Sequence, residues 1–303
     1  MPGNWPLSKR RKALVERGAI FNRVRSFFQE KGYLEVETPF RIPAPAPEAH
    51  IDAVASAGWF LQTSPELCMK RMLAAGYQRI FQICRCWRDG ERGVRHLSEF
   101  TMLEWYRAGA DYRHLMEETE ALVQAAAALP RIGYRGLTID LALPWERVTV
   151  AEAFRLYAGT SVSEALGAGS FDQIMVEQIE PRLGLTRPTF IYDYPPCCAA
   201  LARLKKDDPT VAERFELYIG GLEIANAFSE LTDPAEQRIR FEAAAAERAS
   251  SGKAPYPVAE KFLAALGAMP DSAGIALGLD RLVMVLLDAE SIDEVVAFTT
   301  EEL

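Results

Sequence analysis

Two pairs of strand-like segments, each joined by a turn, constrain the fold of this chain more than any other feature. Residues 79–88 and 100–106 are rich in apolar side chains, and the ten residues 89–98, which are polar and contain glycine, lie between them. Residues 215–219 and 222–228 are joined by Gly220-Gly221, a two-residue signal for a tight hairpin. Because the strands of a hairpin pair in opposite directions, the sequence predicts an antiparallel sheet.

Helical patterns surround these strands. Leu14, Phe21 and Phe28 recur every seven residues, which predicts a helix over 9–31 with one apolar face. Further helices are expected at 65–75, 112–129, 234–251, 258–266 and 281–287, and further strands at 33–38, 190–194 and 275–279. Residues 149–184 are mostly helical in pattern and are interpreted as an insertion. We therefore expect a single domain of the α+β class over residues 1–303.

Composition excludes several classes of protein. Apolar residues make up 49% of the chain, enough for a full core, and the formal net charge is −8. An acidic balance argues against a broad nucleic-acid-binding face. No apolar run reaches the roughly 18 residues that span a bilayer, and residues 1–11 lack the apolar stretch of a signal peptide. Five unevenly spaced cysteines favour reduced thiols, so we expect a cytoplasmic protein with no membrane contact.

Basic residues gather at the first hairpin. Arg88 ends the first strand, and the loop that follows adds Arg92, Arg95 and His96. A guanidinium group is planar and permanently charged, and it binds phosphate oxygens in pairs. The pattern favours a loop that folds over a polyphosphate. The alternative is a surface hairpin with scattered charges.

Two glutamates flank the Gly220-Gly221 turn. A two-residue turn places Tyr218 opposite Glu223 and Glu216 opposite Ala225, so the two carboxylates are expected to be diagonal neighbours. Such neighbours lie roughly 7–8 Å apart and can share a divalent ion. The alternative is a pair of solvated glutamates on an edge hairpin.

The same strand continues into Asn226, Phe228 and Glu230. In a regular strand these three side chains face away from Glu223, and only a bulge would bring all of them into one site. An aromatic ring between a carboxamide and a carboxylate suits a substrate that carries an ammonium group. A plain alternating strand end is the other interpretation.

Small residues are frequent at 274–281, where the last expected strand leads into a helix. They allow a flat ligand to approach the backbone. Arg281 at the start of a helix opposes the helix dipole, and a bound phosphate would remove that conflict. A tight strand-to-helix turn without a ligand is the alternative.

Together and in this order, these segments resemble the motifs of class II aminoacyl-tRNA synthetases. Residues 32–39 resemble motif 1, residues 81–88, 95–96 and 99–106 resemble motif 2, and Gly278-Leu279-Asp280-Arg281 resembles motif 3. Residues 63–66 and 221–233 are similar to the lysyl subgroup. The resemblance covers residues 9–300 and implies an antiparallel sheet flanked by helices.

The resemblance also implies roles for individual residues. Arg88 and Arg281 would be catalytic, with Arg88 on the α-phosphate and the developing charge, and with His96 and Arg281 on the outer phosphates. The implied ATP-binding residues are Arg88, Asp89, His96, Phe100, Glu223, Ile224, Gly278 and Arg281. The implied magnesium ligands are Glu216 and Glu223. The implied substrate-binding residues are Ser64, Glu66, Glu104, Tyr106, Asn226, Glu230 and Ala276.

Within the family, the resemblance is strongest to short lysyl paralogues that attach lysine, in its (R)-β-lysyl form, to a lysine of elongation factor P. Residues 100–107 and Ala276 carry this resemblance. Lysyl-tRNA synthetases usually have glycine where Ala276 stands. It implies ATP and Mg²⁺ as cofactors, lysine or (R)-β-lysine as substrate, and a homodimer built on motif 1. Few residues precede the first helix, so we expect no anticodon-binding domain and no tRNA partner.

The sequence departs from the family pattern at two positions of motif 2. Gly90 stands where the family usually has glutamate, although Glu91 follows at once, and Leu97 stands in place of an asparagine. Two alternatives therefore stay open beside the elongation factor P ligase. One is a free-standing lysine adenylate-forming ligase with another acceptor, and the other is a non-catalytic synthetase-like binding protein.

Overall fold

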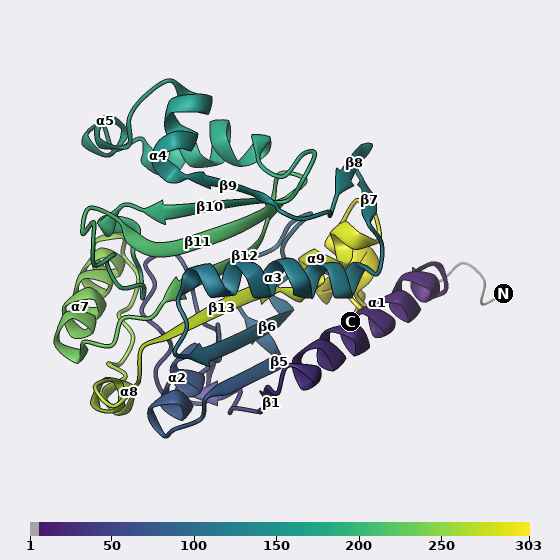
Figure 1. Ribbon diagram of the computed structural model, residues 1–303. Helices are drawn as coiled ribbons and strands as arrows, with labels where there is room; N and C mark the ends of the chain where they lie inside the picture. Colours follow the sequence, from purple (N-terminus) through teal and green to yellow (C-terminus); the bar gives the residue numbers. More distant parts are fainter. Residues whose placement is uncertain (1–5) are drawn as a thin grey trace.

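An eight-stranded sheet organises the computed structural model, which describes residues 6–303 (Figure 1). In spatial order its strands are β1 (Leu34–Glu35), β5 (Arg79–Trp87), β6 (Glu99–Ala108), β13 (Ser272–Gly278), β12 (Leu222–Ser229), β11 (Ala212–Ile219), β10 (Thr189–Tyr194) and β9 (Glu146–Thr149). Neighbours pair antiparallel except at the two edges, where β1 runs parallel to β5 and β9 parallel to β10. The expected α+β class is confirmed, and the sheet is mixed at its edges.

Three helices cover one face of this sheet. They are α1 (Pro6–Glu30), α3 (Tyr112–Ala127) and α9 (Leu279–Leu286). Their apolar sides pack on Phe81, Leu103, Trp105, Ile275 and Leu277 in the largest core cluster. Alternate residues of a strand point to opposite faces, so Gln82, Glu104 and Ala276 face away from these helices. Side chains with carboxylate and amide groups thus lie on the second face of the sheet.

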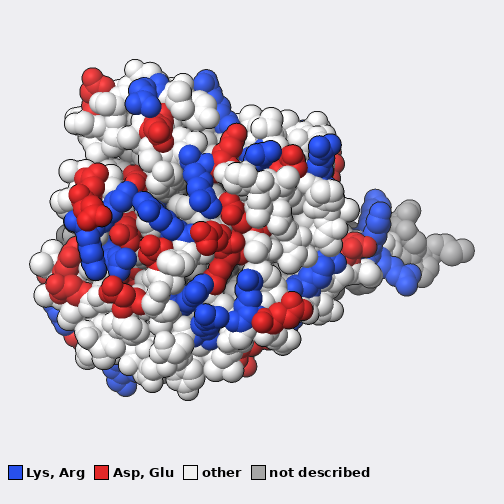
Figure 2. All heavy atoms as spheres, viewed as in Figure 1, with Lys and Arg blue, Asp and Glu red and all other residues white. Residues whose placement is uncertain are grey.

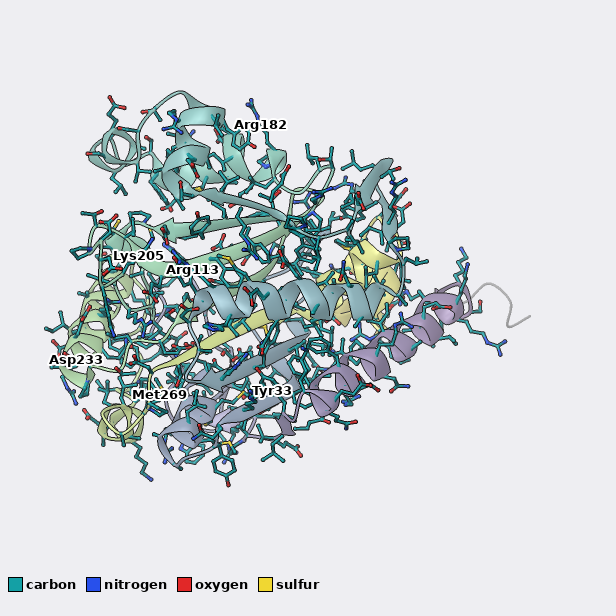
Figure 3. All side chains as sticks on the ribbon, in the orientation of Figure 1. Tyr33, Arg113, Arg182, Lys205, Asp233 and Met269 are labelled. Carbon is teal, nitrogen blue, oxygen red and sulfur yellow. The ribbon has the colours of Figure 1, made fainter. Side chains whose placement is uncertain are left out.

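The second face is covered at one end only by a smaller helical layer. It consists of α2 (Glu66–Ala74), α7 (Pro234–Ser250) and α8 (Glu260–Leu266), whose apolar residues pack with Ile80 and Tyr106. Asp233 caps α7 by accepting hydrogen bonds from the Ala235 and Glu236 amides, and Pro234 follows as the first helical residue (Figure 3). This layer closes the end of the sheet at which β6 finishes and β13 begins.

The segment between β9 and β10 is helical in short pieces. It contains α4 (Val150–Ala153), α5 (Val162–Gly167) and α6 (Phe171–Ile174), interrupted by π-helical turns over 154–158 and 175–179 and followed by a 3-10 turn over 180–182. Its apolar residues form a cluster of their own with β10 and Tyr218. The helical pattern expected at 149–184 is therefore present, although no single long helix forms.

Several short elements escaped the sequence analysis. The hairpin β7 (Arg131–Tyr134) and β8 (Leu137–Asp140), the edge strand β9, and the small sheet of β2 (Arg41–Ile42), β4 (Trp59–Leu61) and β3 (Ala55–Ser56) were not expected. The strand expected at 33–38 is wrong in length, because only Leu34 and Glu35 pair with β5. Residues 1–5, part of the expected single domain and of the stretch without a leader pattern, lie outside the described residues.

Surface charge is mixed over the face that Figure 2 presents, where basic and acidic side chains alternate instead of separating into patches. All five cysteines are free thiols, as expected. Among residues 6–303, no helix is both long and apolar enough to cross a membrane.

Gly184 fixes the end of the helical segment against the sheet. The Gly220 amide donates to the Gly184 carbonyl at 2.8 Å, and the Gly221 amide donates to the Leu183 carbonyl at 2.9 Å. Gly184 has φ +72°, and a Cβ there would lie 2.4 Å from the Tyr218 carbonyl oxygen. Only glycine fits, because both the backbone conformation and the close approach exclude a side chain.

Replacing Gly184 by alanine should lower the free energy of unfolding by roughly 1–3 kcal/mol, since the new methyl group meets a backbone atom that cannot move aside. Urea unfolding monitored by circular dichroism measures the change. Gly169→Ala is the matched control, because Gly169 also has positive φ (+64°) but nothing lies near its missing Cβ. Equal losses in both variants would show that backbone conformation, and not the close approach, sets the requirement.

Candidate active site

A straight row of paired residues crosses the second face of the sheet. Gln82 of β5 is opposite Glu104 of β6, and Glu104 is opposite Ala276 of β13. Ala276 is in turn opposite Asn226 of β12, which is opposite Glu216 of β11. Residues directly opposite each other in adjacent strands have Cβ atoms about 5 Å apart. Five strands therefore deliver their polar side chains, with one small residue between them, to one strip of surface.

A β-bulge in β12 makes this row possible. Tyr218 pairs with Glu223 as expected, but Leu217 pairs with Ala225, so Ile224 is an extra residue. The expectation that Glu216 faces Ala225 is wrong, because the bulge shifts the register and places Glu216 opposite Asn226. Both Ile224 and Ala225 turn into the main core. Glu223 and Asn226 consequently share a face, which a regular strand would not allow.

Glu104 is the most deeply buried acid of the row, at 0% exposure. Ser64 donates a hydrogen bond to one of its carboxylate oxygens at 2.6 Å, and the Tyr106 hydroxyl donates to the other at 2.9 Å. Burial, followed by the nearby Glu66, raises the pKa of Glu104 to about 8. The site thus holds a carboxyl group that is poised to ionise when a cation arrives.

Lys70, which the sequence analysis missed, lies beside two of the predicted substrate-binding acids. Its Nζ is 2.5 Å from Glu66 Oε1 and 2.5 Å from Glu230 Oε2. Burial raises the pKa of Glu230 to about 7, although Lys70 opposes this shift. The i,i+4 spacing of Glu66 and Lys70 on one helix is visible in the sequence. Their burial beside Glu230 depends on tertiary packing and is not.

Gly274 gives this acid cluster its room. A Cβ at Gly274 would lie 2.2 Å from the Tyr106 ring and 2.3 Å from Glu230 Oε1. Gly274 is opposite both Tyr106 and Phe228 in the sheet. Tyr106 and Glu230 can therefore lie over the β13 backbone only because this residue has no side chain.

Arg214, also missed, holds the other end of the row. It donates to Glu216 Oε1 at 2.6 Å, to Asn226 Oδ1 at 3.2 Å and to the Cys198 carbonyl at 2.6 Å. The Tyr218 hydroxyl donates to the second Glu216 oxygen at 2.8 Å. Glu216 and Asn226 are thus fixed in position before any ligand binds.

The Arg281 guanidinium contacts both Glu223 and His96. Arg281 donates to the Glu223 carbonyl at 3.0 Å and to its carboxylate at 3.1 Å, and its second nitrogen lies 2.6 Å from His96 Nε2. Burial and Glu216 raise the pKa of Glu223, while Arg281 and Arg88 lower it. Burial and then Arg281 lower the pKa of His96, so the imidazole is neutral and accepts the hydrogen bond.

The remaining predicted nucleotide-binding residues lie around this cluster with differing geometry. The Arg88 guanidinium lies 5.1 Å from the centre of the Phe100 ring and 3.8 Å from Glu91. Asp89 is exposed, and its amide donates to the Asp52 carbonyl. The Ile224 side chain is buried in the core, which leaves its backbone alone for a ligand. A Cβ at Gly278 would meet only Arg281 atoms at 3.5 Å or more.

The start of α9 is held in place from two sides. Asp280 accepts a hydrogen bond from the Thr101 amide at 2.7 Å and pairs with Arg17 of α1 at 2.5 Å. Arg17 also donates to the Thr101 hydroxyl. Arg281 therefore projects from a helix end that is tied to β6 and α1.

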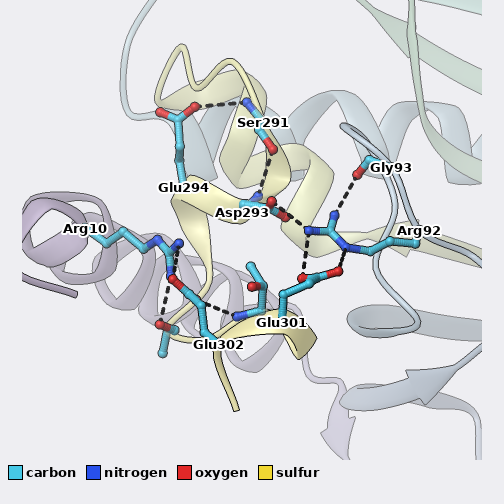
Figure 4. A network of polar contacts seen from close by, with 10 residues as sticks. Arg10, Arg92, Gly93, Ser291, Asp293, Glu294, Glu301 and Glu302 are labelled. Carbon is cyan, nitrogen blue, oxygen red and sulfur yellow. Dashed lines mark hydrogen bonds and ion pairs between the residues drawn. The ribbon is translucent and has the colours of Figure 1, made fainter. Parts of the chain in front are cut away.

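The loop between β5 and β6 is tethered to the C-terminal segment (Figure 4). Arg92 pairs with Asp293 at 2.8 Å and with Glu301 at 2.8 Å, and the Ile292 amide donates to the Val94 carbonyl. Leu97 is buried in the main core and anchors the returning end of the loop. The residue that replaces the family asparagine thus has a packing role.

Glu216 and Glu223 are the predicted magnesium ligands, and Arg214, Tyr218 and Arg281 contact their carboxylates in this structure. Among the described residues, no group of three or more His, Cys, Asp or Glu side chains is placed to hold one. Magnesium bound to nucleotide phosphates takes only one or two protein carboxylates, so a pair is sufficient. Glu180, at the end of the helical segment, is affected electrostatically by both of these carboxylates. Burial, then Glu216 and Glu223, raise the pKa of its carboxyl to about 7.

Glu104→Gln should flatten the pH dependence of stability. The Glu104 pKa is about 8 in the folded chain against 4.5 for an ordinary glutamate, so folding takes up a proton between these values. Wild-type stability should therefore fall as pH rises from about 5 to 8, and the variant should lose less over that range. Urea unfolding at intervals of pH measures both slopes, with Glu242→Gln on the exposed side of α7 as the control. Identical slopes in all three proteins would show that Glu104 does not take up this proton.

Residues 7–302 match the model of the family described as tRNA synthetases class II (D, K and N). A protein of Erwinia tasmaniensis named elongation factor P–(R)-β-lysine ligase is 40% identical over 319 residues, which cover 98% of each chain. Proteins with the same name are similar in Proteus mirabilis (40% over 315 residues, 97% of each chain) and Klebsiella pneumoniae (39% over 318 residues, 98% of each chain).

Proposed function

This chain belongs to the class II tRNA synthetase family, and we propose that it uses ATP to activate lysine or (R)-β-lysine and transfers it to a lysine side chain of elongation factor P. Relatives that match over nearly the whole chain bear the name of that ligase. The observation that carries the proposal is the row from Glu104 to Glu216, which has buried acids at one end and guanidinium groups near the other.

The substrate's ammonium groups would bind at the acidic end. Glu66, Glu104 and Glu230 supply carboxylates there, while Ser64 and Tyr106 hold Glu104 in orientation. Asn226, fixed by Arg214, would orient the substrate's carboxylate toward the guanidinium end. Buried acids are suited to this task because a desolvated cation needs paired carboxylates.

ATP would bind along Arg88, His96 and Arg281, with Phe100 as the stacking ring for adenine and with Asp89, Ile224 and Gly278 beside it. Arg88 lies over Phe100 in this structure, so the ring and the guanidinium are already adjacent. Magnesium, held by Glu216 and Glu223, would neutralise charge on the phosphates. Arg281 would leave Glu223 for phosphate oxygens, which match its planar fork better.

No protein nucleophile is needed for this chemistry. The substrate carboxylate attacks the α-phosphorus of ATP and pyrophosphate leaves, which gives the aminoacyl-adenylate. The acceptor amine then attacks the adenylate carbonyl, loses a proton and releases AMP. Arg88 stabilises the charge that develops in both steps, so positioning and electrostatics account for the rate enhancement.

The wider arrangement of the protein is also a proposal. The chain would act as one catalytic domain with a helical insertion near 149–184, with elongation factor P and not tRNA as its acceptor, in the cytoplasm. A homodimer would form through the edge strand β1. A concavity of about 520 Å³ lies there, lined by Arg25, Glu35 and Phe40 among others, and Leu34 beside it is half exposed. Sedimentation of a monomer at micromolar concentration would argue against the dimer.

Exchange of labelled pyrophosphate into ATP, dependent on (R)-β-lysine, tests the activation step. Arg88→Ala should reduce this exchange by about 100-fold or more, because the variant lacks the donor for the developing charge. Arg85→Ala is the matched control, since Arg85 lies in β5 three residues before Arg88 and is exposed. An absence of exchange in the wild-type protein with either lysine isomer would favour the non-catalytic alternative.

The acceptor is tested separately by mass spectrometry. Wild-type protein with ATP and (R)-β-lysine should add one β-lysyl group to elongation factor P and none to tRNA. A gain in mass on tRNA alone would contradict elongation factor P as the acceptor and would leave a lysine adenylate-forming ligase with another acceptor.

Ala276→Gly should shift preference toward α-lysine. The Ala276 methyl group stands between Glu104 and Asn226, where it occupies space beside the substrate's α-carbon. One methyl group discriminates by roughly 10-fold to 200-fold, and the ratio of kcat/KM for the two isomers measures it. A ratio unchanged from wild type would show that the isomer is selected elsewhere.

A further inference from the structure

Lys70 is a buried cation that the proposed reaction does not use. It is 1% exposed, and it projects from α2 into the acidic end of the row. Lysine is almost never buried this deeply unless it is paired. Burial lowers the Lys70 pKa, but Glu230 and Glu66 outweigh that effect and raise it, so the ammonium stays charged.

The charges of this cluster match those of a diamine. When ionised, Glu66, Glu104 and Glu230 carry three negative charges, and Lys70 cancels one of them. Arg203, which also acts on Glu230, is already paired with Glu213 and Asp271. Two negative charges remain, which equals the number of ammonium groups on lysine or β-lysine. A buried site whose charge balances that of the two ammonium groups avoids the large cost of an unpaired charge.

Lys70 also leaves a defined acceptor for the substrate. It pairs with Glu230 Oε2, while Glu230 Oε1 is buried without a hydrogen-bond partner in the described structure and lies over Gly274 beside Tyr106. A buried carboxylate oxygen with no donor is costly. A ligand ammonium group placed there would supply the missing donor.

We propose that Lys70 determines the substrate class, because it sets the charge of the site so that amino acids with two ammonium groups are accepted and those with one are rejected. This proposal rests on the proposed function and extends it. Lys70 does not touch the reacting atoms. It acts through Glu66 and Glu230, and it is therefore a specificity-determining residue and not a catalytic one.

The test compares (R)-β-lysine with 3-aminohexanoate, which lacks the distal amine, in pyrophosphate exchange. The readout is the ratio of kcat/KM for the two compounds. Glu66→Gln alone leaves one negative charge, so the ratio should fall by roughly 10-fold or more, the worth of one charged hydrogen bond. Adding Lys70→Met to this variant restores two negative charges. The ratio should then return to within about threefold of wild type, which is a strong coupling between adjacent sites.

The double variant Glu66→Gln/Lys70→Met also guards against misfolding. Lys70→Met alone leaves both Glu66 and Glu230 without their cation, whereas the double variant leaves only Glu230 without it and is therefore the milder change to this buried cluster. In the double variant, KM for ATP should match that of wild type, and the melting temperature should lie above that of Lys70→Met. These values separate an effect on specificity from a general loss of structure.

The outcomes are distinct. Recovery of the ratio in the double variant supports the charge-setting role of Lys70. A ratio in the double variant that is as low as in Glu66→Gln, or lower, while wild type retains exchange with (R)-β-lysine, overturns that role and leaves the proposed function intact. No exchange in wild type overturns the proposed function and the role of Lys70 with it. A double variant that does not fold overturns it as well, since Lys70 would then be needed for the fold itself.

Discussion

One extra residue in β12 is the constraint on which the whole site depends. Without the bulge at Ile224, either Glu223 or Asn226 would point into the apolar core beneath α3. A buried, unpaired carboxylate or amide in that core would cost several kcal/mol. The bulge changes the phase of the strand, so both residues face outward and two adjacent apolar residues face inward. Local irregularity here increases the number of polar groups that one sheet face can present.

Burial of charge is the second constraint, and it is met by pairing. Lys70 pairs with Glu66 of its own helix and with the distant Glu230, Arg214 pairs with Glu216 of its own strand, and Asp280 pairs with Arg17 of another helix. Such pairs add little net stability, because desolvation offsets their attraction. Their effect is on geometry: each fixes a side chain of the row, or the helix that carries Arg281, before any ligand arrives. Fixed dipoles and charges are what catalysis by positioning requires.

The sequence predicted the elements whose signals are local. The two hairpins, the long helices and the Tyr218–Glu223 pairing followed from periodicity and from the glycine turn. The β7–β8 hairpin was missed because Arg135-Gly136 at its turn is not the usual Asn-Gly or Asp-Gly pair, although both residues adopt positive φ. The bulge was left open because Ile224 looks like any other apolar strand residue, and its register shift is settled only by packing on both sides.

The residues of the candidate site show the same difference between local signals and features that depend on the complete fold. Arg88, Glu104, Asn226 and Arg281 were predicted from the family motifs, and their roles stay a prediction. The structure places Glu104 and Asn226 in one row across the sheet. Lys70 and Arg214 were missed although each has a partner close in the sequence, Glu66 and Glu216, because their burial depends on the complete fold. A lysine on a helix face is usually solvated, and nothing local distinguishes this one.

The tether between the β5–β6 loop and the end of the chain has a practical consequence for handling the protein. Glu301 and Glu302, which hold Arg92 and Arg10, stand immediately before Leu303. Any purification tag or reporter fused after Leu303 would begin within two residues of these carboxylates and compete for their contacts. The loop leads back to His96, which lies beside Arg281. A fusion that loosens the tether would therefore disturb the proposed nucleotide site and lower apparent ATP affinity, with no substitution in the site itself.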